Sequence, residues 1–220
     1  MHWSIETARL KFRNDIYLPL TKEIRKKGLN SDTFTIIANN CWGGMIYESY
    51  GIKKMSPTIG MFIMPKDYIR FLSNMEYYLK CPLVFINENE SKWKNTLCKK
   101  SNWGTYLIAR LEDIELHMLH YHNKEEAERK WYERVRRISY DRLLVKFNDQ
   151  NGCELSDIYD FCKLNYNNKL VFVAKKNFVI DPCVVYIKQP YNNNTGIMAS
   201  REPFGHSKYI NVTSYINDLK

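Results

Sequence analysis

Hydrophobic and polar positions along the first third of the chain change from a helical to a strand period. In residues 4–29 apolar and basic positions recur with a spacing nearer to that of a helix, and Gly28 supplies a stop. A basic amphipathic helix is therefore predicted within residues 1–30. The β-branched apolar run of residues 33–38 predicts a strand buried on both faces. Residues 59–64 form another apolar run before Pro65 and a helical pattern, which predicts a strand followed by a helix.

The rest of the chain continues to mix the two periods. Strands are predicted at residues 83–86, 106–110, 114–120, 143–147, 170–174 and 184–187. One helix begins after Asn123, with Asn123 as its cap and Glu126 as the capping-box partner, and another covers residues 155–164. The Asn-rich residues 191–195 predict a surface loop, and residues 209–219 predict a docking helix or strand.

Alternation of buried strands with amphipathic helices is typical of α/β proteins. We therefore expect one α/β domain over residues 1–220, in which residues 31–220 form a Rossmann-like three-layer core. The sheet is expected to be mostly parallel, with antiparallel pairing in its middle section. A length of 220 residues with 45% hydrophobic residues suits one domain with its own core.

Cysteine usage indicates a reducing environment. The six cysteines are dispersed and no two form a C-x-x-C pair, which argues against a disulfide scaffold and against a zinc ribbon. Residues 1–6 lack the anatomy of a signal peptide, and no apolar segment is long enough to span a membrane. A cytoplasmic protein is expected. No residues are assigned as metal ligands, and the sequence leaves open whether a metal or a cofactor is used.

The net charge gives a first indication of the partner. With 33 Lys and Arg against 24 Asp and Glu, the chain carries +9, which favours an anionic partner. Basic residues are scattered among acidic ones, and no nucleic-acid-binding signature occurs, so a specific nucleic-acid partner is disfavoured. Neither a Walker-type phosphate loop nor a G-x-G-x-x-G motif is present. The expected partner is an anionic small molecule, a nucleotide-sugar or a glycan, and peripheral membrane association is compatible with the charge.

The most informative motif follows the first predicted strand, where residues 39–44 (NNCWGG) lead into a helix. In α/β sheets, ligands bind beyond such strand ends, where the next helix offers free N–H groups. A helix N-terminus lowers the pKa of a thiol, which would activate Cys41, and neighbouring amides could hold an oxyanion. A buried cysteine in a tight turn is the competing interpretation. The candidate binding residues of this turn are Asn39, Asn40, Trp42, Gly43 and Gly44.

Three segments of the chain resemble one family. Residues 36–44 (IIANNCWGG) and 56–58 (SPT) resemble the uncharacterised bacterial family called domain of unknown function nineteen-nineteen, often labelled exopolysaccharide biosynthesis protein. Residues 109–121 resemble its second block, and residues 127–138 its basic helix. Ala109 stands where the family usually has glycine, and Glu112 where a small residue is common. The resemblance implies a Rossmann-like α/β fold and a link to surface glycan synthesis, but no established reaction.

Candidate acid–base residues gather between Asp113 and His122. A strand would place His117 and Asp113 on one face and His120 on the other, whereas a helix would bring all three together. One of these histidines could be the base for Cys41, with Asp113 orienting it, and an ordinary hydrogen-bonded histidine is the alternative. The H-x-x-H-x-H spacing matches neither common zinc pattern.

Most basic residues of the helix after Asn123 have an acidic residue four positions earlier and should pair with it. Arg134 and Arg136 do not, so they are candidate anion ligands, as is Arg110 at a strand end. Residues 201–208 have the polar, turn-rich character of a binding loop or of any surface loop.

Two functional hypotheses follow. The first is an enzyme of cell-surface or exopolysaccharide biosynthesis that transfers an acyl or O-acetyl-type group to a sugar at the Cys-Trp-Gly-Gly turn. Its catalytic candidates are Cys41, His117, His120 and Asp113. The second is a non-catalytic module that binds an anionic glycan or nucleotide-sugar at the same turn.

Overall fold

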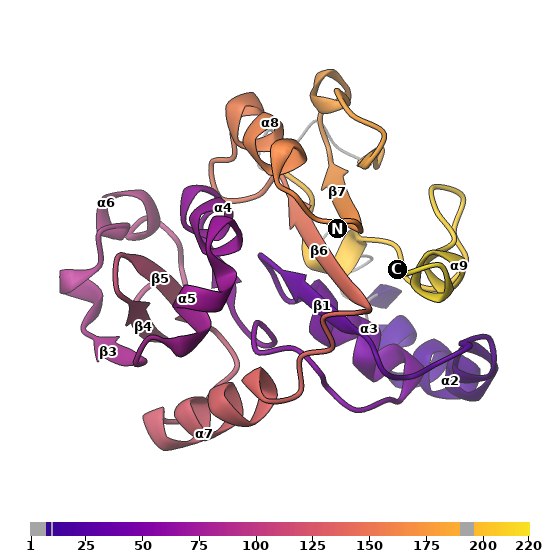
Figure 1. Ribbon diagram of the computed structural model, residues 1–220, viewed down its shortest axis with the longest axis horizontal. Coiled ribbons are helices and arrows are strands. Elements are labelled where there is room, and N and C mark those ends of the chain that lie inside the picture. Colours follow the sequence, from indigo (N-terminus) through magenta and orange to yellow (C-terminus); the bar gives the residue numbers. More distant parts are fainter. Residues whose placement is uncertain (1–7, 10, 190–195) are drawn as a thin grey trace.

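The strands form two four-stranded sheets in the part of the chain that the structure describes, residues 8–9, 11–189 and 196–220 of this computed structural model (Figure 1). Sheet A is parallel and has the order β1-β6-β7-β8. Sheet B is antiparallel and has the order β2-β5-β4-β3. The α/β prediction is confirmed. The expectation of one mostly parallel sheet is wrong, because the antiparallel middle section pairs within itself and forms its own sheet.

The strands of sheet A are β1 (Thr35–Ala38), β6 (Leu143–Asn148), β7 (Lys169–Val173) and β8 (Val184–Tyr186). Those of sheet B are β2 (Phe62–Ile63), β5 (Ile114–Met118), β4 (Leu107–Leu111) and β3 (Val84–Ile86). The α-helices are α2 (Leu18–Lys27), α3 (Trp42–Tyr50), α4 (Pro65–Ser73), α5 (Met75–Lys80), α6 (Lys94–Leu97), α7 (Lys124–Val135), α8 (Leu155–Lys163) and α9 (Val212–Asn217). The shorter helical turns are η1 (Arg13–Tyr17), η2 (Glu88–Glu90), η3 (Lys176–Phe178) and η4 (Ala199–Arg201).

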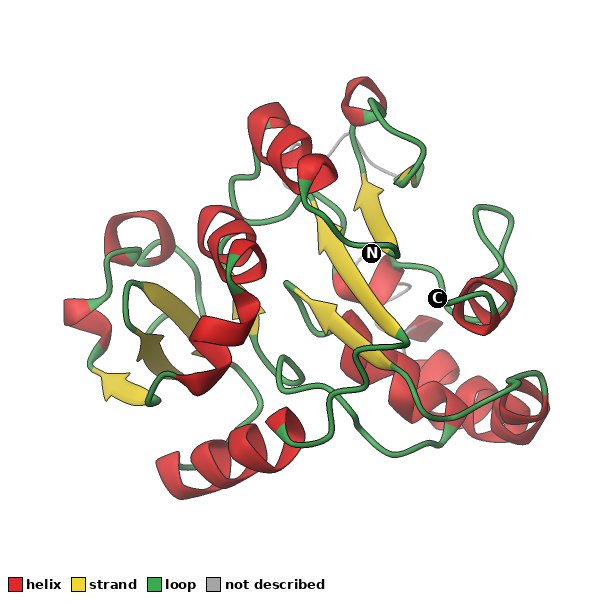
Figure 2. Ribbon diagram, viewed as in Figure 1, coloured by secondary structure: helices red, strands yellow, loops and turns green. Residues whose placement is uncertain are grey.

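Helices cover both faces of sheet A (Figure 2). All four residues of β1 are buried, as the apolar run predicts. Ile36 and Ala38 pack with side chains of α3 and α9, whereas Ile37 packs with side chains of α4 and α8. Because neighbouring strand residues point to opposite faces, a short apolar run can supply both contacts.

Helix boundaries follow the local signals in the sequence. α2 ends at Gly28, and Pro65 opens α4. Asn123 caps α7 by accepting a hydrogen bond from the Glu126 backbone N–H at 2.8 Å. The Glu126 carboxylate accepts from the backbone N–H of His122 and not from that of Asn123, so the predicted capping box is only half formed. The loop predicted at residues 191–195 lies outside the described residues.

Sheet B and α4 lie on one side of sheet A (Figure 1). The two sheets meet where the Ile63 backbone N–H of β2 donates to the Asn39 carbonyl at 3.0 Å, just beyond β1. Consequently the segment before β2, which contains Ile59 and Gly60, reaches the N-terminal end of α3. The carboxyl end of β1 is thereby enclosed by elements far apart in the sequence.

Candidate functional site

A cavity of about 280 Å³ opens beside the N-terminal end of α3. Cys41 and Gly44 line it from the strand–helix turn, and Arg134 lines it from α7. Gly60 before β2 and His120 after β5 line it from the same end of sheet B, where the His120 backbone N–H donates to the Gly60 carbonyl at 3.0 Å. Four of the residues predicted from sequence, Cys41, Gly44, His120 and Arg134, therefore share this cavity. We call it the α3 cavity.

Glycines allow the walls of the α3 cavity to approach one another. A Cβ atom on Gly44 would lie 2.9 Å from Ile59 Cγ2, so α3 could not pack this closely with a larger residue. Gly60 has φ +79°, and its Cβ would lie 3.3 Å from the ring of Tyr121. Gly43 has a different role, because its Cβ would meet Ile36 of β1 at 3.3 Å and it packs α3 on the sheet.

Arg134 is the most unusual residue of the α3 cavity. Its side chain is buried, and no carboxylate of the described residues lies within 4 Å of the guanidinium. One of its terminal nitrogens, Nη1, donates to the Tyr121 hydroxyl at 2.8 Å, and that hydroxyl donates to the Ile59 carbonyl at 2.5 Å. A buried cation normally has an anionic partner. Arg134 is thus held by neutral oxygens at the wall of a cavity.

The remaining charges of the α3 cavity are also mainly positive. Lys54 and Lys130 line it together with Arg134, and Glu48 is the carboxylate among the lining residues. Lys54 pairs with Glu48 at 2.6 Å, and Lys130 pairs with Glu126. These two pairs satisfy the lysines and leave Arg134 as the cavity-lining cation without an ion pair among the described residues. The α3 cavity therefore favours an anionic group.

The structure changes the interpretation of Cys41. It occupies the N-cap position of α3, and its thiol lies 3.7 Å from the Met61 carbonyl. Burial, together with a smaller contribution from the nearby Glu202, raises the pKa of this thiol to about 11. The expected lowering at the helix N-terminus is therefore wrong, because desolvation outweighs the helix dipole. Cys41 is mainly a neutral thiol near neutral pH.

A buried polar network lies directly behind this turn. Lys146 of β6 and Glu202 both have fully buried side chains and form an ion pair at 2.5 Å. The same carboxylate oxygen, Oε1 of Glu202, accepts from the amides of Asn40 at 3.1 Å and Asn148 at 2.9 Å. Burial lowers the pKa of Lys146 to about 8 and raises that of Glu202.

This network fixes the shape of the strand-end turn. The Asn40 side chain accepts from the Trp42 backbone N–H at 3.1 Å, and the Trp42 indole donates to the Pro203 carbonyl at 2.7 Å. Asn39 donates to the Asn148 side chain at 3.0 Å. Asn39, Asn40 and Trp42 thus point into the protein and position the turn, and Asn40 also lines a cavity.

A second cavity, of about 430 Å³, lies on the other side of Cys41 and Met45. Asn40 lines it, together with Gln150 and Asn151 after β6 and Ala199 of η4. Its position beyond the carboxyl ends of β1 and β6 is where α/β sheets bind ligands. Two adjoining cavities therefore meet at Cys41.

His117 does not reach the α3 cavity. It lies on β5, fully buried, with its ring stacked on Phe62 at a centroid distance of 4.5 Å. Neither ring nitrogen has a hydrogen-bond partner in the described structure. Burial lowers the pKa of His117 to about 3, which leaves it neutral and unsuited to proton transfer near neutral pH. The strand alternative from the sequence is the one observed, and it separates His117 from His120.

Asp113 and Arg110 serve sheet B. Asp113 lies in the turn between β4 and β5, where it accepts from Tyr78 at 2.7 Å and pairs with Arg70. Arg110 pairs with the buried Glu115 at 3.3 Å and donates to the Glu90 carbonyl. Neither residue lines the α3 cavity, so the expected orientation of a histidine by Asp113 is absent from the described structure.

Lys146 and Glu202 were not among the residues singled out from the sequence. The sequence did contain an indication for Lys146, because a lysine within the otherwise apolar strand of residues 143–147 must be buried. For Glu202 there was no such indication in the sequence beyond its place in residues 201–208. Arg136, predicted beside Arg134, is exposed.

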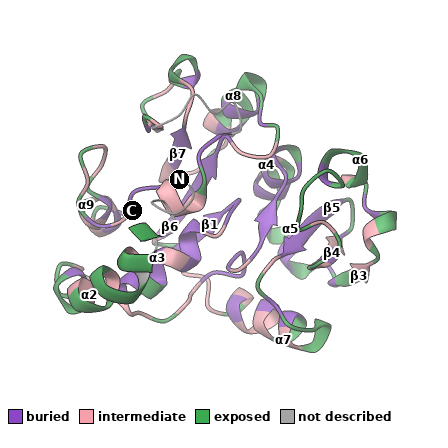
Figure 3. Cartoon of the chain, turned by 180° about the vertical axis from the view of Figure 1, so that it is seen from behind, coloured by how far each residue is buried: buried purple, intermediate pink, exposed green. Residues whose placement is uncertain are grey.

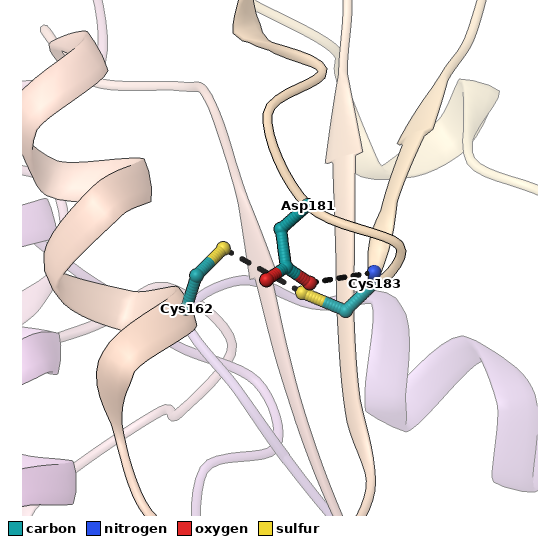
Figure 4. A group of neighbouring side chains, drawn as sticks. All are labelled: Cys162, Asp181 and Cys183. Carbon is teal, nitrogen blue, oxygen red and sulfur yellow. Dashed lines mark hydrogen bonds between the residues drawn. The ribbon is translucent and has the colours of Figure 1, made fainter.

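One group of side chains could hold a metal ion. Cys162 at the end of α8 and Cys183 before β8 have their sulfur atoms 3.6 Å apart, and Asp181 accepts from the Cys183 backbone N–H at 2.9 Å (Figure 4). The group offers three ligand atoms, one fewer than a structural zinc site needs. It shares no residue with the α3 cavity.

In the described part of the chain, no helix combines the length and hydrophobicity needed to cross a bilayer.

Comparison with known proteins identifies a family and a relative. The family model described as Domain of unknown function (DUF1919) matches residues 13–220. An uncharacterized protein of Haemophilus influenzae is 30% identical over 156 residues, which cover 71% of this chain and 68% of that protein. Neither description names an activity.

Proposed function

We propose a function from the residues of this chain, because it belongs to the family described as Domain of unknown function (DUF1919), and that description names no activity. The protein binds the anionic part of a nucleotide-sugar or acidic glycan in the α3 cavity. The observation that carries this proposal is the buried Arg134 guanidinium, which faces the cavity without a carboxylate partner in the described structure. A phosphate or carboxylate bound there would supply that partner.

The surroundings of Arg134 support an anion more than a neutral ligand. Gly44 in the first turn of α3 lines the cavity, so the positive end of the helix dipole lies beside it. Lys54 and Lys130 stand on the same wall, although each already has a carboxylate partner. The volume of the α3 cavity, about 280 Å³, is large enough for a small anionic group but leaves little room for the rest of a larger ligand.

The second cavity supports a ligand with an anionic and a neutral part. It adjoins the α3 cavity at Cys41 and Met45 and offers amide side chains, which suit sugar hydroxyls. A nucleotide-sugar or acidic glycan has both parts. We also propose that the protein acts in the cytoplasm, in the assembly of a surface polysaccharide. For the fold, we propose that sheet A and the helices on its two faces form a Rossmann-like three-layer arrangement.

Calorimetric titration of the full chain tests this proposal. UDP-glucuronic acid is the probe, and uridine and glucose serve as matched neutral controls. We expect saturable binding of the nucleotide-sugar, weakened by salt, and no binding of the two neutral compounds. Equal affinity for uridine and UDP-glucuronic acid, or no binding of any nucleotide-sugar or acidic glycan oligomer, contradicts the proposal.

A transferase acting on a sugar is the second candidate, because Cys41 and His120 line the same cavity and a second cavity adjoins Cys41. With its pKa raised to about 11, Cys41 would act as a nucleophile only after a base removes its proton, and we propose His120, which lines the same cavity, as that base. In this case Cys41→Ala abolishes transfer of the acyl group to the sugar. If the protein only binds, Cys41→Ala leaves the affinity for UDP-glucuronic acid unchanged.

A further inference from the structure

The N-terminal helical segment, η1 and α2 with the turn before them, has its apolar side chains on the outside. Phe12, Ile16, Leu20 and Ile24 are 58%, 46%, 75% and 72% exposed. They follow one another at intervals of four residues. In an α-helix of about 3.6 residues per turn, such side chains would move gradually around the helix, but the wider π-helical turn of η1 offsets this rotation and keeps them on one face. We call these four side chains the apolar stripe.

The inward face of the same segment is polar. The buried residue of α2 is Arg25, whose Nε donates to the Ser49 carbonyl of α3 at 2.9 Å. Its Nη2 donates to the Leu18 carbonyl at 2.7 Å, and its guanidinium stacks over the ring of Phe204 at 5.7 Å. Burial lowers the pKa of Arg25. α2 is thus attached to the protein by an arginine, while its Leu20 and Ile24 side chains face solvent.

This arrangement is the reverse of that in an ordinary surface helix, whose apolar face covers the core. α2 lies at the edge of the molecule with its outer face open (Figure 3). A row of large exposed apolar side chains on one helix marks an interaction surface. The stripe therefore needs a partner that α3 and the core do not provide.

The charged side chains next to the stripe indicate which kind of partner it binds. Lys11, Lys26 and Lys27 are exposed beside it, against the acidic residues Asp15 and Glu23 on the same segment. A helix with an apolar face flanked by lysines fits the surface of an anionic bilayer, into which the stripe inserts while the lysines meet headgroups. A second copy of this chain fits less well, because a symmetric contact would bring the same lysines together.

We propose that the apolar stripe and its flanking lysines dock this protein on an anionic phospholipid surface. The α3 cavity would then lie close to that surface. A groove of about 560 Å³ between α2 and α3 shares Met45 and Glu48 with the α3 cavity, so the docked helix is next to the proposed ligand site. The lipid interaction does not depend on the ligand proposed for the cavity.

Sedimentation with lipid vesicles tests the docking. The 220-residue chain is mixed with vesicles of phosphatidylcholine alone or of phosphatidylcholine with an equal part of phosphatidylglycerol, without any nucleotide-sugar. We expect sedimentation with the anionic vesicles, reduced by high salt, and much less with neutral ones. Wild-type protein that stays in solution with the anionic vesicles overturns the proposal.

Variants separate the stripe from the charge. Leu20→Ser with Ile24→Ser should reduce vesicle affinity at least about tenfold, since two apolar side chains no longer enter the bilayer. Tyr159→Ser with Val179→Ser removes two exposed apolar side chains elsewhere, 52% and 46% exposed, and should have no effect. Equal vesicle binding by wild type and the stripe variant overturns the proposal.

Lys26→Gln and Lys27→Gln should each weaken binding about fivefold, whereas the exposed Lys163→Gln should not. Light scattering of the same variants tests the competing occupant. A wild-type dimer that becomes a monomer on Leu20→Ser with Ile24→Ser would make the stripe a self-association surface and overturn lipid docking. Circular dichroism checks that each variant remains folded.

Discussion

Protonation of His117 should be costly, and this can be measured as a pH dependence of stability. Burial lowers the pKa of His117 to about 3, with repulsion from Lys100 and Lys92 as lesser causes. In the unfolded chain a histidine has a pKa of about 6.5. As the pH falls below about 6.5, His117 becomes protonated in the unfolded state but stays neutral in the folded state, so the free energy of unfolding decreases. The stability that neutral His117 contributes is fully present above that pH and is lost progressively towards about pH 3.

The expected magnitude follows from the two pKa values. One pKa unit corresponds to about 1.4 kcal/mol, so lowering the pH from about 7 to about 5 should remove about 2 kcal/mol of stability through His117. Other groups titrate over the same range, so the effect must be isolated by a variant. His117→Phe keeps a ring stacked against Phe62 and removes the two nitrogens without hydrogen-bond partners. His122→Gln, at an exposed position, is the matched control.

Urea denaturation at both pH values provides the assay. Wild type and His122→Gln should lose about 2 kcal/mol more than His117→Phe between about pH 7 and about pH 5. Identical losses in all three proteins would refute the reasoning, as would an NMR titration that places the pKa of His117 near 6.5.

Two further predictions concern the strand-end turn. Glu202→Gln should destabilise the protein by about 3–5 kcal/mol, because it leaves Lys146 buried without its counter-ion, and Lys146→Met in the same chain should recover much of this loss in urea denaturation. Additive losses in the double variant would show that the pair is not coupled. In timed alkylation followed by mass spectrometry, the exposed Cys98 should react well before Cys41, whose pKa burial raises to about 11. Faster reaction at Cys41 would mean that its thiol is activated after all.

Local sequence signals predicted much of the fold. The apolar run before Asn39, the proline that opens α4 and the cap at Asn123 each act through neighbouring residues, and the structure has β1, α4 and α7 there. Pairing between strands is long-range, and nothing in the sequence distinguished a separate antiparallel sheet from a mixed one. Sheet B was therefore missed as a unit.

The candidate site was predicted only where chain neighbours define it. The strand-end turn with Cys41 lies where expected, but its partners come from distant segments: Arg134 from α7, and Glu202 from a loop 56 residues after Lys146. Spacing alone could not separate the buried Arg134 from the exposed Arg136, because both lie at the end of one helix. The burial that raises the pKa of Cys41 likewise depends on the packed structure.

The central claim is that Arg134 binds the anionic part of a ligand in the α3 cavity. Its most direct test is the calorimetric affinity of Arg134→Gln for UDP-glucuronic acid, with Arg136→Gln as the control on the same helix. We expect Arg134→Gln to weaken binding at least about tenfold, since a charged hydrogen bond contributes about 1.5–3 kcal/mol, while Arg136→Gln binds like wild type. Lys130→Gln provides a second cavity variant if Arg134→Gln does not fold. Unchanged affinity in a folded Arg134→Gln protein, or equal losses in the Arg134 and Arg136 variants, would contradict the account.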